Sequence, residues 1–514
     1  MVYGDYDCDG VISTYILYKA LKDLGALVDY YIPSREEEGY GMNSSRIEKL
    51  KEEGYQVILT CDNGISAFEQ VRLAVELGFT VVITDHHDIP YVEFEGEKRY
   101  IVPDAHAVIN PKQKDCSYPF KLLCGAGVAL KFVSCLYEEM GIGKVKAEKF
   151  IEYAAIATVC DVVDLLEENR IIVKYGLEML NNTKNLGLKA LIKETSIENK
   201  KISAYHLGFI IGPEINATGR LETAALAVEL LLSDNEEKAK ELAAKLHELN
   251  TERQNLTQKS VEYLDELLKA SYNLNHKVIL LYSPSVHESI AGIAAGRIKE
   301  KYNLPTIVLT KGKEVPKGSA RSIEGYNIFE ELSKCKHLME KFGGHPMAAG
   351  LSIKEGNIDI LREELNNNCT LTEEDVLPKV RIDTVLPLYE VSYDLIERLE
   401  LYEPFGKGNS TPAFADKNIE LTRLWYIGKE KNILKCRLRI ANSNLFIEGI
   451  SFDKGEEFKE QLIDALGQEG AEAVIASSFA SMKVDLIFYP SINEFNGVRS
   501  LQLIIKGIRI SEVN

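Results

Sequence analysis

The chain has 514 residues, 45% of them hydrophobic and 27% charged, which describes a folded globular protein with more than one domain. The sequence has no apolar run long enough to cross a bilayer and no signal-peptide pattern, so we expect a cytoplasmic protein without membrane contact. The formal net charge of -18 argues against broad attraction to polyanions but allows a local basic groove or a bound metal, and nine cysteines without a CxxC pair argue against a cysteine zinc site.

The first element is a short strand at Met1–Tyr3, followed by the stretch GDYDCDG. This stretch holds Asp5, Asp7 and Asp9 at alternate positions beside two glycines. Carboxylates packed this closely repel one another, so the folded protein needs a cation near them. The stretch therefore predicts a metal site close to the N-terminus.

Two more buried strands end in residues of the same kind. Val57–Leu59 leads to Asp62, a helical pattern follows at Ser66–Leu77, and Val81–Ile83 leads to Asp85, His86 and His87. Strands that alternate with helices predict a parallel sheet, whose ligands bind beyond the carboxyl ends of the strands. We predict that these side chains meet at that edge.

A fourth apolar segment, Ala154–Val159, is predicted as another strand, which would deliver Asp161. Carboxylates mixed with imidazoles suit manganese or a similar divalent ion, and the set is larger than one ion needs. Two ions close together would stabilise both the attacking and the leaving oxygen of a phosphoester displacement. A single Asp after a strand is more often a helix N-cap, but four such strand ends favour a metal site.

The motifs carry a family resemblance. DYDCDG, CDNG and the DHH triplet resemble the ordered motifs of the DHH phosphoesterase superfamily. Later blocks are similar to the RecJ family of single-stranded-DNA exonucleases over nearly the entire chain. These blocks are Ile32–Gly41, Asn110–Ala129, Gly212–Leu221, His287–Ile298, Gly318–Ile328 and Phe342–Ser352.

The resemblance implies a function and a ligand set. The family hydrolyses single-stranded DNA from the 5′ end to 5′-mononucleotides in DNA repair and recombination, with two manganese or magnesium ions and a bridging water as nucleophile. The family's catalytic motifs match Asp7, Asp9, Asp62, His86 and His87. Its metal ligands match the same five residues together with Asp5, Asp85 and Asp161.

A long helix is predicted at Asn235–Ala270, where apolar residues recur at helical spacing. A helix of this length would measure about 50 Å and would hold two domains apart across a cleft. A plain packed helix or a coiled coil is the alternative. The apolar strand Lys277–Leu281 begins soon afterwards and favours the spacer interpretation.

The next domain is glycine-rich and basic around Gly343-Gly344-His345, where small residues permit a close approach of phosphate. The resemblance implies that His345 faces the substrate, and that Arg35, Ser319 and Arg321 hold the terminal 5′-phosphate. The full set of expected substrate contacts is Arg35, Asn216, Arg220, Arg297, Ser319, Arg321 and His345. A tight turn is the alternative for the glycine pair, and surface salt bridges are the alternative for the arginines.

The last part of the chain reads as a small β-barrel that resembles the oligonucleotide-binding (OB) barrel of the family. Aromatic residues such as Trp425, Phe446 and Phe488 would suit base stacking, but core packing is the stronger expectation for each of them. The expected strands are Ile433–Ile440, Leu445–Phe452, Ala473–Ala476, Val484–Tyr489 and Leu501–Ile505.

These features predict an α/β protein with a parallel-sheet DHH domain, a long helix, a smaller α/β DHH-associated domain and a C-terminal OB barrel. The expected bounds are 1–220, 221–270, 271–375 and 376–514. Three departures from the family are expected to matter: the sequence begins almost on the family's first motif, without the segment that precedes this motif in the family, Glu214 occupies a usually basic position, and Ser289-Ile290 replaces Gly-Val.

Two other functions compete with the exonuclease. A DHH phosphoesterase for short oligonucleotides, cyclic dinucleotides or polyphosphate needs neither a long track nor a terminal barrel. A noncatalytic nucleic-acid-binding scaffold would not need the intact acidic and histidine motifs. The expected partners are single-stranded DNA and, by the resemblance, a single-stranded-DNA-binding protein and a helicase, with the chain itself a monomer.

Overall fold

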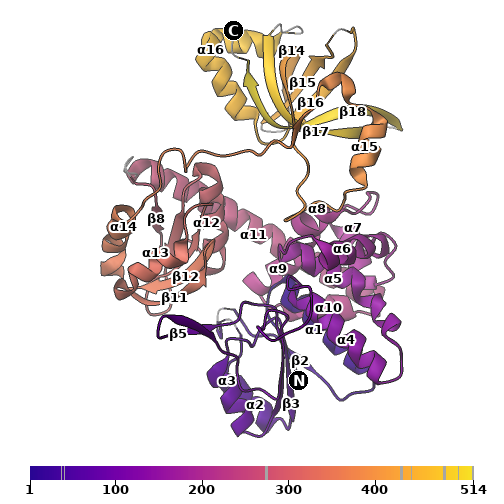
Figure 1. Ribbon diagram of the computed structural model, residues 1–514, viewed down its shortest axis with the longest axis vertical. Helices are drawn as coiled ribbons and strands as arrows, with labels where there is room; N and C mark the ends of the chain where they lie inside the picture. The colour runs from indigo at the N-terminus through magenta and orange to yellow at the C-terminus, as the bar shows by residue number, and fades with distance from the viewer. Residues whose placement is uncertain are drawn as a thin grey trace. The chain divides into compact units, whose positions relative to one another are not determined.

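The computed structural model describes residues 1–35, 37–39, 41–271, 276–428, 432–441, 443–477, 482–495 and 497–511. The chain forms two compact units, Met1–Pro378 and Lys379–Asn514 (Figure 1). Of the helices in these described ranges, none combines the length and the apolar character needed to span a membrane.

The first unit begins with a five-stranded sheet in the order β2-β1-β3-β4-β7, and every neighbouring pair in it is parallel. The predicted parallel sheet is confirmed. Its strands are rich in β-branched side chains and mostly buried, as expected of strands covered on both faces. The strands are β1 (Val2–Tyr3), β2 (Tyr30–Tyr31), β3 (Val57–Cys61), β4 (Thr80–Thr84) and β7 (Ala107–Ile109).

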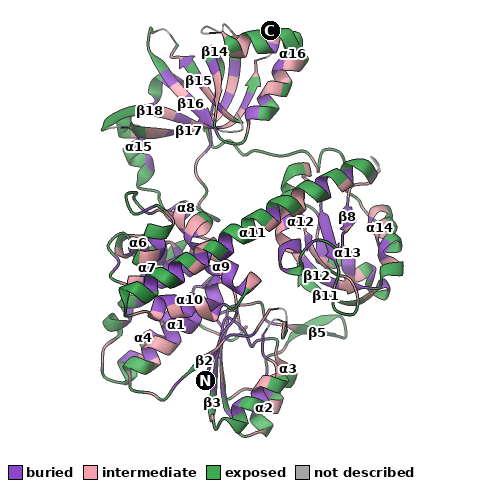
Figure 2. Ribbon diagram, turned by 180° about the vertical axis from the view of Figure 1, so that it is seen from behind, coloured by how far each residue is buried: buried purple, intermediate pink, exposed green. Residues whose placement is uncertain are grey.

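Helices cover both faces of this sheet. Helices α2 (Ser44–Glu52) and α3 (Phe68–Glu76) share one core cluster with β3 and β4. On the other face, α1 (Cys8–Asp23) is buried along most of its length against α4 (Gly125–Glu139). Figure 2 shows this buried layer in purple. A two-stranded hairpin, β5 (Tyr91–Phe94) and β6 (Glu97–Tyr100), extends from the same region.

The prediction of a fourth strand at Ala154–Val159 is wrong, because this segment lies in helix α5 (Ile151–Cys160). The helix packs against α1, α4 and α6, and its middle is buried on all sides. An apolar run that is buried all round has no helical periodicity, so it cannot be told from a buried strand by pattern alone. Asp161 is therefore the C-cap residue of a helix.

Further helices complete this lobe, and then one long helix leaves it. Helix α11 (Glu236–Ser271) has 36 residues and a length of about 54 Å, which confirms the predicted long helix. It packs first against α7, α9 and α10 and later against α12, so it connects two lobes (Figure 2). The remaining elements of the first lobe are η1 (Lys144–Phe150), α6 (Glu167–Leu180), α7 (Leu186–Glu194), α8 (Ala204–His206), η2 (Leu207–Ile211), α9 (Gly212–Leu221) and α10 (Ala225–Leu232).

The second lobe has a mixed sheet in the order β11-β12-β10-β9-β8, in which only the β8–β9 pair is parallel. Its strands are β8 (Ile279–Tyr282), β9 (Thr306–Thr310), β10 (Lys317–Arg321), β11 (Met339–His345) and β12 (Ala348–Ile353). Its helices are α12 (Glu288–Tyr302), α13 (Ile328–Lys334), η3 (Lys336–Leu338), η4 (Glu355–Asn357) and α14 (Ile358–Asn367).

The second unit is a barrel, since its sheet order β13-β14-β15-β16-β18-β17 is closed by an additional β14–β17 pairing. The predicted barrel is confirmed, but β14 was missed, and Ala473–Ala476 belongs to helix α16 instead of a strand. Phe458 and Leu462 of α16 enter the barrel core. The elements are β13 (Thr384–Val385), η5 (Leu388–Glu390), α15 (Tyr393–Glu400), β14 (Phe414–Ile427), β15 (Ile433–Arg439), β16 (Phe446–Ser451), α16 (Gly455–Ala476), β17 (Met482–Phe495) and β18 (Val498–Ile510).

Candidate metal centre

The GDYDCDG stretch forms the turn from β1 into α1. Asp7 is the N-cap residue of α1, and its Oδ1 accepts a hydrogen bond of 2.9 Å from the backbone N–H of Gly10. A Cβ atom at Gly10 would lie 2.5 Å from the backbone oxygen of Asp5, so only glycine fits there. The turn therefore needs its glycine to bring the carboxylates together.

Asp9 lies in the first turn of α1 and points at the N-terminus of α4. Its two oxygens accept hydrogen bonds from the backbone N–H groups of Gly125 (2.6 Å) and Ala126 (2.7 Å). Burial and the charge of Asp7 raise the pKa of Asp9 to about 6, and these two hydrogen bonds act against that rise. Asp9 is thus fixed by a helix that begins 116 residues later in the chain.

Asp62 follows β3 with a backbone φ of 59°, which is unusual for a residue other than glycine. Its N–H donates to the backbone oxygen of Thr84, which ties the turn to β4. A Cβ atom at Gly125 would come within 2.7 Å of Asp62 Cβ, so α4 approaches this carboxylate closely. Burial and the neighbouring carboxylates, Asp9 first, raise the pKa of Asp62 well above its usual value.

Asp85 follows β4, and both of its oxygens are engaged by protein donors. It accepts hydrogen bonds from the backbone N–H groups of Ile65, His86 and His87, and it lies 2.8 Å from Nδ1 of the His87 ring. Burial acts to raise the pKa of Asp85, but the bonds from His87 and Ile65 outweigh it, and the pKa is lowered. A ring that donates from Nδ1 leaves Nε2 available as a ligand atom.

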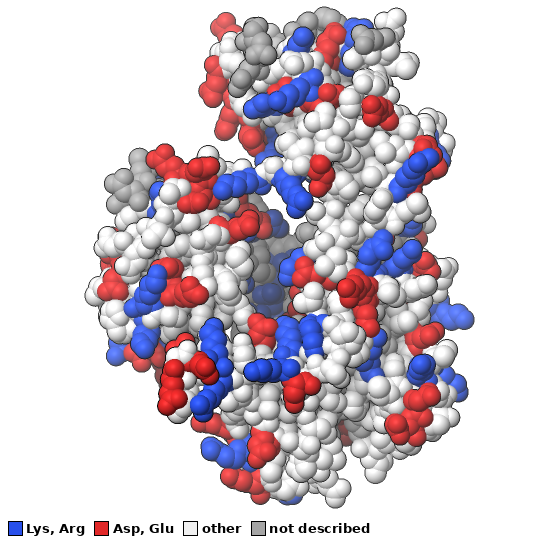
Figure 3. All heavy atoms as spheres, in the orientation of Figure 1, with Lys and Arg blue, Asp and Glu red and all other residues white. Residues whose placement is uncertain are grey.

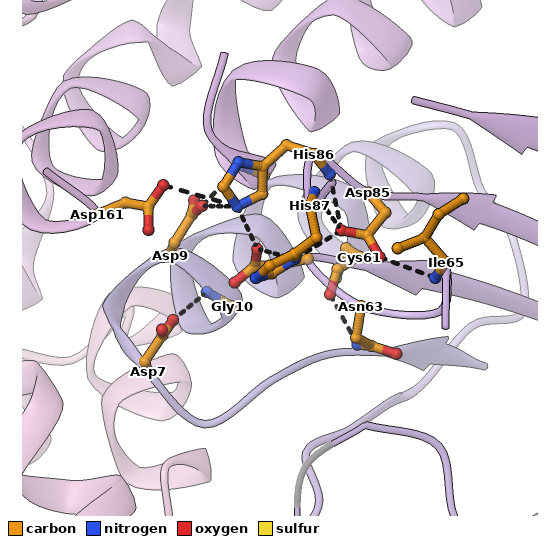
Figure 4. A network of polar contacts seen from close by, with 12 residues as sticks. Asp7, Asp9, Gly10, Cys61, Asn63, Ile65, Asp85, His86, His87 and Asp161 are labelled. Carbon is orange, nitrogen blue, oxygen red and sulfur yellow. Dashed lines mark hydrogen bonds and ion pairs between the residues drawn. The ribbon is translucent and has the colours of Figure 1, made fainter. Parts of the chain in front are cut away.

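His86 lies at the centre of the carboxylates (Figure 4). Its Nε2 is 3.1 Å from Asp62 Oδ1, 3.7 Å from Asp9 Oδ2 and 3.6 Å from Asp161 Oδ2. Burial is the main cause that lowers the pKa of His86 to about 3, so the ring is neutral at neutral pH. A neutral imidazole among carboxylates is a ligand type for manganese and related ions.

The residues at this edge fit divalent metal ions. Buried polar atoms without a hydrogen-bond partner among the described residues include Asp5 Oδ1, His86 Nε2 and Asp161 Oδ2. Asp62 and His86 each belong to two of the groups whose ligand atoms lie within 4.8 Å of one another, which suits two neighbouring ions. The three groups are Asp62, His86 and His87; Asp9, His86 and Asp161; and Asp5, Asp7 and Asp62.

Two predicted substrate contacts support the site from α9. Asn216 Oδ1 accepts a hydrogen bond of 2.9 Å from the backbone N–H of Cys8, so this side chain holds the start of α1. Arg220 donates from Nη1 to the backbone oxygen of Ser289 at 2.8 Å, which links α9 to α12. Burial lowers the pKa of Arg220 to about 10, and the positive charge of Arg35 adds to this effect.

The three residues expected at the 5′-phosphate lie near one another in the first unit. Arg35 lies over the ring of Tyr6 at 5.2 Å, next to the acidic turn. A Cβ atom at Gly292 of α12 would be 2.9 Å from Arg321 Nη2 and 3.2 Å from Ser319 Oγ, so both side chains face α12. Burial lowers the pKa of Arg321, and the charge of Arg35 lowers it further. Figure 3 shows Lys and Arg side chains around the hollow between the two lobes of this unit.

Two other predicted contacts are exposed. The Arg297 side chain is 66% exposed and lies 3.7 Å from Glu300. The His345 side chain is 63% exposed, with Nδ1 3.9 Å from Asp88 Oδ2. Because Asp88 follows the DHH triplet, this pair brings His345 of the second lobe to the border of the acidic cluster.

Some residues around the site were not predicted. Lys112 donates to Asp88 at 2.8 Å, and Asn110 donates to the backbone oxygen of His87 at 2.9 Å. Both residues lie in the block Asn110–Ala129, which resembles the family, so the resemblance could have indicated them. Arg253, in the middle of α11, is among the charges that lower the pKa of Arg220. The sequence did not single it out, because it is one charged residue among many on an amphipathic helix.

The outer face of the barrel combines aromatic and basic side chains. The Arg423 guanidinium lies 5.0 Å from the Trp425 ring, and those of Arg437 and Arg439 lie 5.9 and 5.1 Å from the Phe446 ring. Phe446 is 45% exposed, so the expectation of core packing is wrong for this residue. Phe488 is fully buried, and there the expectation is confirmed.

Three family models match the chain. They are described as the DHH family N-terminal domain at residues 1–158, the DHHA1 domain at 275–370 and the RecJ OB domain at 382–507.

Curated proteins named RecJ and solved structures of RecJ are similar to the chain over its whole length. The single-stranded-DNA-specific exonuclease RecJ of Bacillus subtilis is 38% identical over 100% of this chain, which spans 61% of that relative. RecJ of Haemophilus influenzae is 33% identical over 99% of this chain and 87% of its own length. The crystal structure of RecJ from Thermus thermophilus in complex with Mn²⁺ matches with a TM-score of 0.80 and 26% identity, over 100% of this chain and 69% of that one.

Proposed function

The chain belongs to the RecJ family, and on that premise we propose that it hydrolyses single-stranded DNA from the 5′ end and releases 5′-mononucleotides. The observation that carries the proposal is the set of overlapping ligand groups around Asp62 and His86. A pair of divalent ions is what such a set accommodates, and phosphodiester hydrolysis is the chemistry that such a pair serves.

We assign the metal ligands to Asp7, Asp9, Asp62, His86, His87 and Asp161, with Asp5 beside them. Bound manganese or magnesium would supply a water of lowered pKa and positive charge that stabilises the transition state. The protein contributes by holding the ligands in place before substrate binds. Asp9 is fixed by α4, and Asp85 is given a positioning role because its hydrogen bonds hold the DHH triplet.

The direction of cutting requires a group that reads the strand end. We assign this role to Arg35, Ser319 and Arg321, whose hydroxyl and guanidinium groups suit a terminal 5′-phosphate. This assignment is supported by two observations. The charge of Arg35 helps to lower the pKa of Arg321, and the side chains of Ser319 and Arg321 both lie close to Gly292. His345, beside Asp88, is assigned to the substrate from the second lobe.

The barrel is proposed to bind the strand through Trp425 and Phe446. Base stacking on aromatic rings tolerates any sequence, and the arginines beside both rings favour the phosphate backbone. By family membership we also propose a cytoplasmic monomer that receives its strand from a helicase and a single-stranded-DNA-binding protein.

The test uses single strands of two to about 40 nucleotides that carry a radioactive 5′-phosphate, with manganese, so that the released 5′-mononucleotide carries the label. We expect 5′-mononucleotides from long strands and no cutting of blunt duplex. The Asp62→Ala variant should keep its circular dichroism spectrum and lose hydrolysis. Preference for dinucleotides over long strands would favour the short-oligonucleotide alternative, and binding without any turnover would favour the scaffold.

A further inference from the structure

An acidic residue is buried at the contact between α9 and α11. Glu214 of α9 is 2% exposed, and its Oε1 accepts a hydrogen bond of 2.8 Å from Asn250 Nδ2. The same oxygen lies 3.1 Å from Nδ1 of His247, one turn earlier on α11. A buried carboxylate is costly unless it is hydrogen-bonded, and these two side chains engage Oε1, while Oε2 has no hydrogen-bond partner among the described residues.

The chain of hydrogen bonds continues to an arginine. Asn250 is itself buried, and its Oδ1 accepts a hydrogen bond of 2.9 Å from Arg253 Nε. The terminal nitrogens of Arg253 have no acceptor among the described residues, although a guanidinium group offers donors in a planar fork there. Glu214 and Asn250 thus fix the orientation of a fork that is still open to an acceptor.

Two other arginines, Arg297 and Arg220, lie close enough to Arg253 for their charges to interact with it. Burial lowers the pKa of Arg253; Glu214 opposes that fall, and the charge of Arg297 adds to it. Arg253 also contributes to the lowered pKa of Arg220. Positive groups held together and partly out of water repel one another, and a bound anion relieves this repulsion.

The arginines extend along α12 further than the proposed 5′-phosphate contact. Arg220 reaches α12 at Ser289, and Arg321 lies against Gly292. Arg297 is eight residues beyond Ser289, which corresponds to about 12 Å of helix. A line of positive charge of this length suits a chain of phosphates better than a single phosphate group.

Resting on the exonuclease function proposed above, we propose that Arg253 binds an internal phosphate of the single strand. Glu214 and Asn250 act as positioning residues that hold its guanidinium group toward that phosphate. Glu214 therefore contributes to DNA binding indirectly, because it holds Arg253 of α11 in place.

Binding provides the first test. The anisotropy of a 3′-fluorescein single strand of 20 nucleotides is measured with full-length protein in EDTA, where nothing is cut. We expect Arg253→Ala to weaken binding about tenfold and to reduce the slope of log affinity against log salt by about 0.7, as for one lost phosphate contact. Arg253→Lys should restore the slope, because it restores the charge. The control Lys259→Ala removes an exposed charge from the same helix and should change neither value.

Turnover provides the second test. With manganese present, Arg253→Ala should raise KM for the 20-nucleotide strand about tenfold and leave kcat within about twofold. A 5′-phosphorylated dinucleotide has one internal phosphate, at the metal centre, so its KM should not change. Equal loss on both substrates, or no loss on the long strand, would overturn the proposal.

A mutant cycle tests the positioning residues. Asn250→Ala and Glu214→Gln should each raise KM on long strands less than Arg253→Ala does, and neither should add to the effect of Arg253→Ala. If the increases in KM were fully additive in the double variants, Glu214 and Asn250 would not act through Arg253, and the proposed positioning role would be wrong. Wild-type protein that neither binds nor cuts single strands would refute the exonuclease itself, whereas an active enzyme indifferent to Arg253→Ala would refute this inference alone.

Discussion

The variant Asp85→Asn tests whether Asp85 binds metal itself or only positions the residues that do. The carboxylate of Asp85 accepts backbone hydrogen bonds of 2.9, 2.7 and 3.0 Å and meets the His87 ring at 2.8 Å. An amide at this position keeps one acceptor oxygen and turns an N–H donor toward the N–H of either Ile65 or His87. It also removes the charge that orients the His87 ring and increases its basicity.

The loss of such a partner typically lowers metal affinity by about 10–100-fold, or about 1.4–2.8 kcal/mol. The manganese concentration that gives half-maximal exonuclease rate should therefore rise by that factor in Asp85→Asn, and saturating manganese should restore most of the rate. The exposed Asp104 offers a matched control, Asp104→Asn, with an unchanged manganese dependence. A complete loss of rate at every manganese concentration, as expected for Asp62→Ala, would show that Asp85 is itself a ligand.

Three further predictions concern pH, the strand end and the barrel. Burial raises the pKa of Asp161 to about 8, above its value in the unfolded chain, so the melting temperature of metal-free protein in EDTA should fall as pH rises from about 6.5 to 8. Below this range the lowered pKa of His86 acts in the opposite direction to the raised pKa of Asp9. A melting temperature that rises over this range would contradict the burial of Asp161. Arg321→Ala should reduce the preference for 5′-phosphorylated over 5′-hydroxyl strands about tenfold in kcat/KM, and an unchanged ratio would place the end contact elsewhere. Trp425→Ala and Phe446→Ala should each weaken single-strand binding by about 1–3 kcal/mol in anisotropy titrations. Tyr389 is exposed, and Tyr389→Ala serves as the control. If both variants bound the strand as tightly as the control, stacking on this face would be excluded.

The parallel sheet and the meeting of its acidic turns were predictable because each depends on short, local patterns. Asp62 and the DHH triplet follow apolar runs whose length and flanking residues define strands. The segment before Asp161 was predicted wrongly, since a helix buried on every side shows no periodic pattern. Asp161 still reached the site, because the C-terminal end of α5 lies where a strand end was expected.

The roles of Asp85 and Arg253 were beyond sequence reasoning for a different reason. Whether a carboxylate binds metal or holds a ligand depends on which donors surround it, and for Asp85 these include Ile65, twenty residues away. Arg253 depends on Asn250 and Glu214, and the pairing of α9 with α11 is a tertiary contact. The exposure of Phe446 likewise follows from the way the barrel closes.

The contact between Asp9 and the start of α4 has a consequence for biosynthesis. The groups that would hold metal extend from Asp5 to Asp161, and the acidic turn is fixed only after Gly125 has been made. A nascent chain must therefore extend at least 116 residues beyond Asp9 before this carboxylate gains its partners at the start of α4. The carboxylates of the acidic turn repel one another until these partners are in place, so a complete metal centre depends on contacts between residues that are distant in sequence, and such contacts form slowly.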